Sequence, residues 1–378
     1  MSARREVAAY FTRLGIVAFG GPAAHIAMMR EELVRRRRWV TDEQFIDLLG
    51  ITNLIPGPNS TEMAIHLGYT RAGVWGLVLG GMCFIVPAML IVLALAWAYV
   101  RWGALPITTS LLYGVKPVII AVVVQAMWGL ARTAVRGPLL AGAFVASAAL
   151  AVAGVHELVV LFGAGVLAML LASRPRVVAG AVALLAWAST ARALAAATAV
   201  AGGVALGTMT LVFLKIGAVL YGSGYVLLAF LRADFVERLG WLTDRQLLDA
   251  VAVGQVTPGP VFTTATFIGF LLAGLPGALL ATVAIFLPSF VFVAASRPWL
   301  PRLRASRRAA GFLDGVNVAA LGLMAVVAWQ LGRAAIVDTI TVALALASAA
   351  LLVTTRVNSV WLIAAGGVVG VAWRALGP

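Results

Sequence analysis

The chain has 378 residues, of which 62% are hydrophobic and 11% are charged, and its mean hydropathy is +1.03. These values exclude an ordinary soluble domain and place the chain among integral membrane proteins. The net charge of +14 does not predict a nucleic-acid partner, because the Lys and Arg residues lie in short loops between apolar runs, where lipid headgroups are their natural partners.

The chain opens with two apolar stretches that glycine and proline interrupt in the middle. Gly20-Gly21-Pro22 divides residues 6–37, and Pro56-Gly57-Pro58 divides residues 44–70. Proline cannot continue the preceding helical turn, and glycine permits a sharp bend. The pieces beside PGP, of about 12 residues or roughly 18 Å of helix, are too short for a hydrocarbon core of about 30 Å. We therefore expect two re-entrant helical hairpins whose tips meet inside the protein, where broken backbone is tolerated.

Apolar runs near the length of a membrane span make up most of the rest of the chain. The only cysteine, Cys83, lies in one of them and excludes an internal disulfide. No soluble-type catalytic motif and no metal-ligand spacing is present, so we expect no cofactor and no metal. The predicted spans are residues 74–100, 111–131, 138–154, 157–172, 177–200, 275–295, 313–332, 336–353 and 358–374.

The second half of the chain repeats the first. A shift of 202 residues aligns FTRLGIVAFGG, from Phe11, with FLKIGAVLYGS, from Phe213, and about a third of positions 11–58 are identical. Further along the chain the shift becomes 201 residues, which pairs Gly68 with Gly269 and Trp128 with Trp329. Residues 6–172 and 208–374 are thus predicted to be two copies of one unit, joined by a transmembrane helix at 177–200. The start of the chain has the residue order of a signal peptide, but Phe213 lies in an equivalent context in mid-chain, so we interpret this segment as structural.

Two observations predict that the copies have opposite orientations. Re-entrant hairpins leave four full crossings in copy one, and residues 177–200 add a fifth, so copy two begins on the other side of the membrane. A cytoplasmic N-terminus also places most Lys and Arg residues inside, in basic loops such as 30–43 and 297–308. The predicted fold is an all-α integral membrane protein with two inverted-topology repeats, each with two broken re-entrant helical hairpins and about four transmembrane helices. Such repeats are typical of alternating-access carriers.

The broken segments form the candidate binding site. Each PGP turn precedes a half-helix that begins with hydroxyl or amide side chains, and two helix starts would offset about one unit of charge on a dianion. A tight turn with a Ser or Thr cap is the alternative, but its duplication inside apolar sequence favours a site. The predicted substrate-binding residues are Gly20, Gly21, Pro22, His25, Asn53, Pro56, Gly57, Pro58, Asn59, Ser60, Thr61, Gly222, Ser223, Gln255, Pro258, Gly259, Pro260, Thr263 and Thr264.

Among these residues His25 has no counterpart in copy two, where Leu227 takes its place. It is either a proton carrier, an anion donor or a hydrogen-bonded interior histidine. Two further segments, Trp39-Val40-Thr41-Asp42 and Trp241-Leu242-Thr243-Asp244, precede the PGP hairpins. We interpret them as interface anchors and helix caps.

Four ionisable residues near the middle of apolar sequence are candidates for charge compensation or coupling: Arg13, Glu62, Lys116 and Lys215. Arg13 and Lys215 occupy equivalent repeat positions and bring a cation toward each first break. For Arg13 and Lys116, snorkelling to headgroups is the alternative. Glu62 has no acidic equivalent, because Thr264 takes its place. It either carries a coupling proton or forms a salt bridge with Arg13 or Lys116.

Three motifs in order carry a family resemblance: Phe19-Gly20-Gly21-Pro22-Ala23-Ala24-His25, Trp39-Val40-Thr41-Asp42 and Pro56-Gly57-Pro58. They resemble the chromate ion transporter family in its long-chain, two-domain form. The WxTD and PGP motifs recur in copy two, although Gly222-Ser223-Gly224 there departs from the GGP-His pattern. The resemblance implies export of chromate from the cytoplasm across a bacterial inner membrane, with sulfate as a similar tetrahedral dianion.

The residues and the resemblance together predict a secondary transporter of a small oxyanion, and not an enzyme, that works by alternating access. An anion channel built from the same helix ends is the alternative. A membrane enzyme acting on a lipid phosphate is disfavoured, because Glu62 is the only carboxylate near the breaks. The lipid bilayer is a predicted partner, and a homodimer is one arrangement that the sequence allows.

Overall fold

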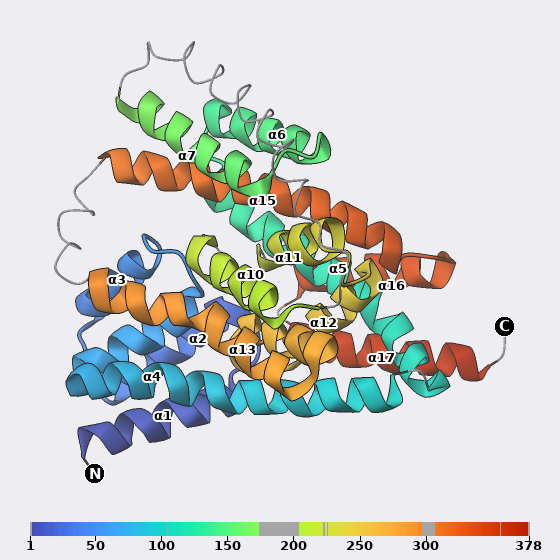
Figure 1. Cartoon of the computed structure of the whole chain (residues 1–378), viewed down its shortest axis with the longest axis horizontal. Coiled ribbons are helices and arrows are strands. Elements are labelled where there is room, and N and C mark those ends of the chain that lie inside the picture. Colours follow the sequence, from blue (N-terminus) through green and yellow to red (C-terminus); the bar gives the residue numbers. More distant parts are fainter. Residues whose placement is uncertain are drawn as a thin grey trace.

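The computed structural model describes residues 2–103, 105–173, 204–221, 224, 226–296, 307–355 and 357–376. Within these ranges all regular structure is helical, which confirms the all-α prediction (Figure 1). The predicted linking helix at 177–200, the site residues Gly222 and Ser223, and most of the basic loop 297–308 lie outside the described residues.

The first predicted break is present. Helix α1 runs from Ala3–Val17, and α2 begins again at Gly21–Met29 and continues into the π-helical segment η1, Arg30–Arg36. Between them Gly20 has φ 103° and Gly21 has φ 74°, backbone angles that favour glycine. Pro22 then occupies the first turn of α2, where its missing N–H costs no hydrogen bond.

The second predicted break separates α3, Asp42–Thr52, from α4, Asn59–Trp102. Inside α4 the backbone leaves helical geometry at Ala72 and at Gly73, whose φ is 62°. The backbone of Gly68 lies against that of Gly76, so the chain reverses here and α4 is a helical hairpin. This turn falls between the predicted runs 44–70 and 74–100. The half-helix of 13 residues before it is about 20 Å long, shorter than a hydrocarbon core.

Three more helices complete the first half: α5 at Pro106–Ala134, α6 at Pro138–Val152 and α7 at Glu157–Ser173. The second half has the same order of elements, apart from an additional short turn, η4, before α13. Its helix α13 reverses at Gly274, where φ is again 62°. The elements are α10 at Leu206–Val219, α11 at Leu227–Leu231, η3 at Arg232–Arg238, α12 at Asp244–Val256, η4 at Val261–Thr263, α13 at Thr264–Ser296, α15 at Arg307–Ala335, α16 at Thr339–Thr354 and α17 at Ser359–Ala375.

Helices of each half pack against helices of the other half, so the halves are not separately packed domains. Helix α5 of the first half contacts α16 and α17 of the second, whereas α15 of the second half contacts α6 and α7 of the first (Figure 1). Small residues permit these close approaches, because the backbone of Gly114 lies against Gly366 and that of Gly315 against Ala164.

Four helices among the described residues are long and apolar enough to cross a membrane: α4, α5, the segment Val261–Ser296 containing α13, and Arg308–Ala335 within α15. The runs predicted at 138–154, 157–172, 336–353 and 358–374 form helices of only 15 to 17 residues. Among the described residues, four of the predicted runs thus form long helices and four form shorter ones. Whether the shorter helices also cross the bilayer stays a prediction.

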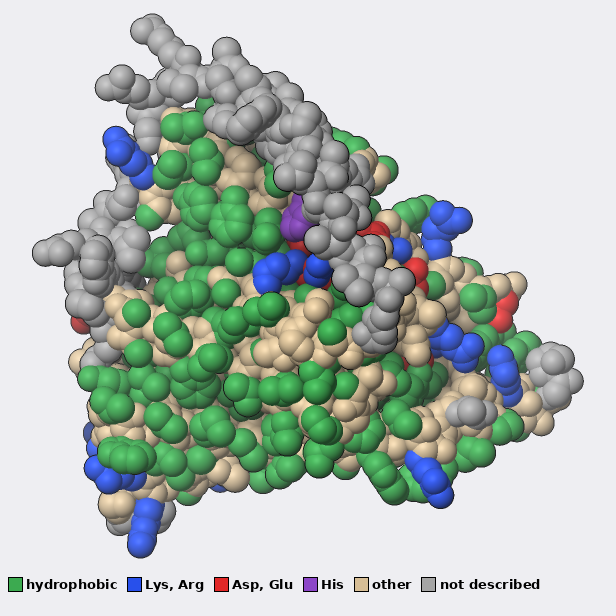
Figure 2. Space-filling model, viewed as in Figure 1, with side chains coloured by type: hydrophobic (Ala, Val, Ile, Leu, Met, Phe, Trp, Pro, Cys, Tyr) green, Lys and Arg blue, Asp and Glu red, His purple; other side chains and the backbone are tan. Residues whose placement is uncertain are grey.

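The surface of the molecule fits a lipid environment. Figure 2 shows a face on which hydrophobic side chains cover the broad middle and most Lys and Arg side chains lie toward the margins. Trp128 and Trp329, which the repeat pairs with one another, are 66% and 70% exposed. Large apolar side chains exposed in this number favour contact with lipid.

Candidate functional site

The two PGP turns each contact the first break of the other half. The N–H of Gly57 donates to the carbonyl oxygen of Leu220 at 2.8 Å, and the N–H of Gly259 donates to that of Ala18 at 2.9 Å. The shift of 202 residues makes Gly57 equivalent to Gly259 and Ala18 equivalent to Leu220. A reciprocal contact of this kind is what an approximate two-fold relation between the halves produces.

Both turns require glycine. Gly57 has φ 139° and Gly259 has φ 90°. A Cβ atom on Gly57 would lie 2.6 Å from Ser289 Oγ, and one on Gly259 would lie 2.6 Å from the Cβ of Ala88. The PGP motif is therefore fixed both by its backbone angles and by the neighbouring helix of the opposite half, since Ser289 is on α13 and Ala88 on α4.

The half-helix after the first PGP turn begins with buried polar side chains. Ser60, Thr61 and Glu62 are almost completely excluded from solvent. The N–H groups of Thr61 and Glu62 donate to the carbonyl oxygen of Pro58, so these two are not free for a ligand, contrary to the expectation of an open helix start. The hydroxyl of Thr61 has no hydrogen-bond partner among the described residues. It is thus available to donate to a bound anion.

The second half differs at the same point. A short 3-10 turn, η4, comes before α13, and the hydroxyls of Thr263 and Thr264 donate to the carbonyl oxygens of Pro260 and Val261 at 2.8 Å. These two hydroxyl groups therefore have no free proton to donate to an anion. Gln255, at the end of α12, is buried, and its Nε2 has no partner within the described part of the chain. Its counterpart Asn53 instead accepts a hydrogen bond from Asn59 at 2.7 Å.

His25 is fully buried at the first break. Its Nε2 lies 3.0 Å from the carbonyl oxygen of Ala18, and its ring meets Phe84 edge-on with centroids 5.5 Å apart. A carbonyl oxygen only accepts, so Nε2 carries the proton, and in the neutral ring Nδ1 is an acceptor. Nδ1 has no partner among the residues described. His25 in this form orders the first break and does not donate to an anion.

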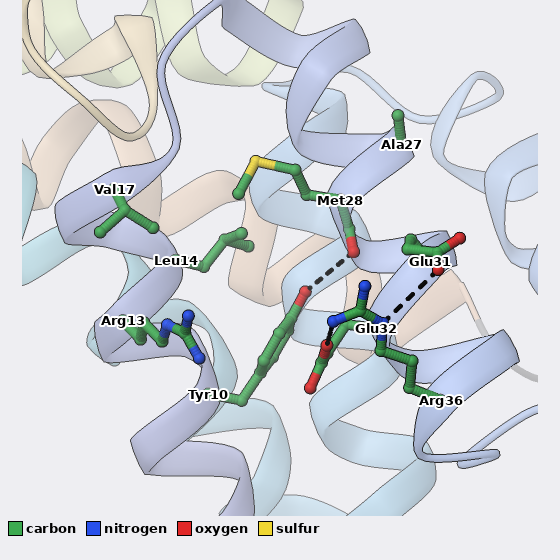
Figure 3. A pocket seen from close by; sticks show the side chains of 9 residues that line it. All are labelled: Tyr10, Arg13, Leu14, Val17, Ala27, Met28, Glu31, Glu32 and Arg36. Atoms are coloured by element: carbon green, nitrogen blue, oxygen red, sulfur yellow. Dashed lines mark hydrogen bonds and ion pairs between the residues drawn. The ribbon is translucent and has the colours of Figure 1, made fainter.

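Arg13 lies away from the PGP turns, in a pocket between α1 and the α2–η1 arm (Figure 3). The side chain is exposed, and Tyr10 spans the pocket to donate to the carbonyl oxygen of Met28 at 3.4 Å. Glu31 and Glu32 line the opposite wall, where both pair with Arg36. The position therefore suits a cation near the surface better than one at the tips.

Lys116 and Lys215 are engaged in ion pairs, and the pairs with Asp249 and Glu157 join the two halves. Lys116 Nζ lies 2.9 Å from Asp249 Oδ1 on α12, and Lys215 Nζ lies 3.0 Å from Glu157 on α7 and 2.6 Å from Asp234 on η3. Sequence reasoning missed all three carboxylates. Each lies near the end of an apolar run or in a mixed-charge loop, and nothing local marks it as the partner of a lysine many residues away.

Glu62 forms no ion pair with Lys116 or with Arg13 in the described structure, so the salt bridge considered from the sequence is wrong here. The side chain instead faces Ser289 across Gly57, because a Cβ on Gly57 would overlap Glu62 Oε1 as well as approach Ser289 Oγ. Ser289 has no sequence signal, since its repeat equivalent is Ala88. No group of three or more His, Cys, Asp or Glu that fits a metal occurs among the residues described.

The WxTD segments are helix caps in both halves, as predicted. Thr41 and Thr243 each accept a hydrogen bond from the N–H three residues later, and Gln44 and Gln246 complete the capping boxes. The following aspartate also pairs with an arginine 12 residues upstream, in Arg30–Asp42 and Arg232–Asp244. The Arg30 guanidinium holds the pKa of the exposed Asp42 carboxyl below its ordinary value.

Comparison with known proteins gives consistent matches. The family model described as chromate transporter matches residues 5–171 and 207–371. The chain is 36% identical over 374 residues to the chromate transport protein of Cupriavidus metallidurans, which covers 96% of this chain and 91% of that protein. It is 34% identical over 346 residues to the probable chromate transport protein of Synechococcus elongatus, with 88% and 86% covered. No solved structure matches.

Proposed function

We propose a transport function for this chain, which belongs to the chromate transporter family. The chain is a multi-pass membrane protein, and the relatives that match it over most of their length are named for chromate transport. We infer that it carries chromate, a small tetrahedral dianion, and that sulfate competes because it has the same shape and charge. Export across a bacterial inner membrane, with a cytoplasmic N-terminus, is the direction that we propose.

The single observation that carries the mechanism is the reciprocal contact between the PGP turns and the first breaks. The contacts Gly57 to Leu220 and Gly259 to Ala18 join four interruptions of helices inside the molecule. Two-fold related repeats that meet at broken helices are the architecture of alternating-access carriers. It supports inverted repeats with re-entrant hairpins, in which movement of one half against the other opens the site to each side in turn.

The oxyanion is proposed to bind where the first PGP turn starts α4. There Thr61 supplies a buried hydroxyl with no partner among the described residues. Gln255, which precedes the second PGP turn, has a buried amide N–H that likewise has no partner within the described part of the chain, and we propose it as a second donor. Unpaired buried donors are costly unless a ligand or water satisfies them. Binding through neutral side-chain donors would leave the dianion weakly held, so that it can be released.

Membrane potential is a sufficient driving force for export. Moving one charge through 100 mV changes the free energy by about 2.3 kcal/mol, and a dianion leaving a negative interior gains twice that. No residue arrangement on the chain is typical of nucleotide binding.

Uptake of labelled chromate into inverted membrane vesicles tests this function, with potential and pH gradient set separately and sulfate as competitor. Saturable uptake that the potential drives, that sulfate suppresses and that shows counterflow supports the carrier. Vesicles with Gly259→Ala in place of the native chain provide the inactive control. Absence of uptake under every gradient would contradict chromate transport, and single-channel currents in a planar bilayer would show a channel instead.

A further inference from the structure

Glu62 has an unusual environment for a carboxylate. It lies in the first turn of α4, its side chain is fully buried, and neither carboxylate oxygen has a hydrogen-bond partner of normal geometry among the described residues. Ion pairs bind the other candidate charges of the interior, Lys116 and Lys215, to carboxylates elsewhere. Glu62 is therefore the interior charge for which the described structure supplies no counter-ion.

The group that faces Glu62 belongs to the other half of the chain. Ser289 on α13 is also fully buried, and its Oγ likewise has no partner of normal geometry among the residues described. Both side chains converge on Gly57, whose N–H is bonded to Leu220 of the second half. The carboxyl thus lies at the junction between the two halves, beside the broken backbone.

The repeat-related position shows that this polar pair is not a requirement of the fold. There Gly259 faces the methyl group of Ala88, and the hydroxyl of Thr264 donates to the carbonyl oxygen of Val261. That position is closed by apolar contact and satisfied hydrogen bonds. The chain has placed a carboxyl and a hydroxyl opposite one another in one half-site only.

An ionised carboxylate without a cation is costly in a protein interior, and the hydroxyl of Ser289 would offset only part of that cost. Two other titratable side chains lie near Glu62. They are Tyr221, which follows Leu220 and lies within electrostatic reach of Glu62, and His66, one turn further along α4. No Lys or Arg among the described residues lies within ion-pair distance of Glu62. A proton removes the charge and turns the carboxyl into a donor for Ser289 Oγ.

We propose that Glu62, facing Ser289 across Gly57, is a proton-binding site coupled to oxyanion transport, a proposal that rests on the transport function above. Thr61, the neighbouring residue, is the proposed oxyanion donor, so an ionised Glu62 would repel a dianion bound beside it. The proton and the oxyanion therefore bind together, and by linkage each raises the affinity for the other. One proton moves with each oxyanion, which lowers the net charge transported from two to one.

The protonated carboxyl is tested without any transport assay. Infrared spectroscopy of the full chain in lipid detects the carbonyl stretch of a neutral carboxylic acid, which lies apart from that of a carboxylate. We expect this band in the native chain and in the control Asp314→Asn, and its loss in Glu62→Gln, which keeps the shape of the side chain. A band that persists unchanged in Glu62→Gln, or that is missing from the native chain near neutral pH, would overturn the proposal.

Coupling is tested in inverted vesicles at zero membrane potential and at a pH above the range in which chromate itself binds a proton. At equilibrium the chromate gradient of the native chain should change about tenfold for each unit of pH gradient. Glu62→Gln should still exchange labelled for unlabelled chromate but lose this response, whereas Asp314→Asn should keep it. Ser289→Ala should shift the pH at which exchange is half-maximal.

The outcomes separate the two proposals. Exchange of chromate with no response to the pH gradient in the native chain, or an equal response in Glu62→Gln, would refute the coupling and leave the transport function standing. Absence of any chromate exchange by the native chain would refute the transport function, while the infrared band would still decide whether Glu62 holds a proton.

Discussion

Lys116 on α5 and Asp249 on α12 form an ion pair in which Nζ and Oδ1 are 2.9 Å apart, with both side chains largely excluded from solvent. The hydroxyl of Tyr99 donates to the second oxygen of Asp249 at 2.8 Å. One carboxylate therefore connects two helices of the first half to a helix of the second. Together with the backbone hydrogen bonds of the PGP turns, this ion pair joins the two halves by polar contacts.

Removal of Lys116 alone should be strongly destabilising. Lys116→Met leaves the Asp249 carboxylate buried without its cation, and the loss of a buried partner costs about 3–5 kcal/mol. The double variant Lys116→Met/Asp249→Asn removes both charges and keeps a partner for Tyr99, so it should recover most of the loss. Thermal unfolding of the purified protein in detergent measures both. A double variant no more stable than Lys116→Met would contradict the importance of the pair.

The second PGP turn should not tolerate a side chain. Gly259→Ala forces a left-handed φ that costs about 1–2 kcal/mol and places a Cβ 2.6 Å from the Cβ of Ala88. We expect a lower melting temperature and loss of chromate transport. Gly142→Ala is the matched control, because a Cβ there meets nothing within 4 Å.

A compensating change separates the effect of backbone strain at Gly259 from that of the overlap with Ala88. Gly259→Ala/Ala88→Gly removes the overlap of the two Cβ atoms but not the backbone strain, so it should recover part of the stability and part of the transport. No recovery at all would show that the contact with α4 does not limit this position.

The two threonines that begin the half-helices should respond differently to loss of their hydroxyls. Thr61→Val removes a hydroxyl without a partner among the described residues, so we expect weaker chromate binding, with KM raised about tenfold for one hydrogen bond. Thr263→Val removes a hydroxyl bonded to Pro260, so it should lower stability with little change in KM. Equal effects of both variants on KM would argue against an asymmetric site.

If the two copies have opposite orientations, equivalent loops lie on opposite sides of the membrane. The side chains of Arg35 and of the equivalent Glu237 are exposed, so single cysteines at these two positions, in a Cys83→Ala background, should be accessible to a thiol reagent. A membrane-impermeant thiol reagent should label position 35 from the cytoplasmic side and position 237 from the other side. Labelling of both from the same face would rule out inverted repeats.

The capping boxes before α3 and α12 should contribute measurably to stability. Thr41→Ala and Thr243→Ala each remove a cap of the N-terminal N–H groups, at a cost of about 1 kcal/mol per site. Thr41→Ser and Thr243→Ser keep the capping oxygen and serve as controls. Thermal unfolding with ligand absent measures the difference, and alanine variants as stable as the serine variants would contradict the assignment.

Local features of the chain could be predicted because their causes are local. Glycine and proline end helices wherever they occur, so the breaks at Gly20–Pro22 and Pro56–Pro58 lie where the sequence predicts them. The caps at Thr41 and Thr243 and the all-α class follow in the same way. The family match also confirms the resemblance read from three motifs. It could be read from the sequence because those motifs are short and contiguous.

Pairing across the halves could not be predicted. Lys116 and Asp249 are far apart in the sequence, and neither residue type nor spacing selects one carboxylate among several. In the sequence Ser289 is one polar residue in an apolar helix, and only the packing of α13 against the first PGP turn places it beside Gly57 and Glu62.

The sequence by itself thus determined which segments are helical, where they break and that the chain repeats, since these depend on backbone sterics and on hydrophobic pattern. Only the tertiary structure decided which buried charges are neutralised and which is left without a counter-ion, because the environment of a charge is set by the side chains packed around it. Glu62 differs from Lys116 and Lys215 for that reason alone.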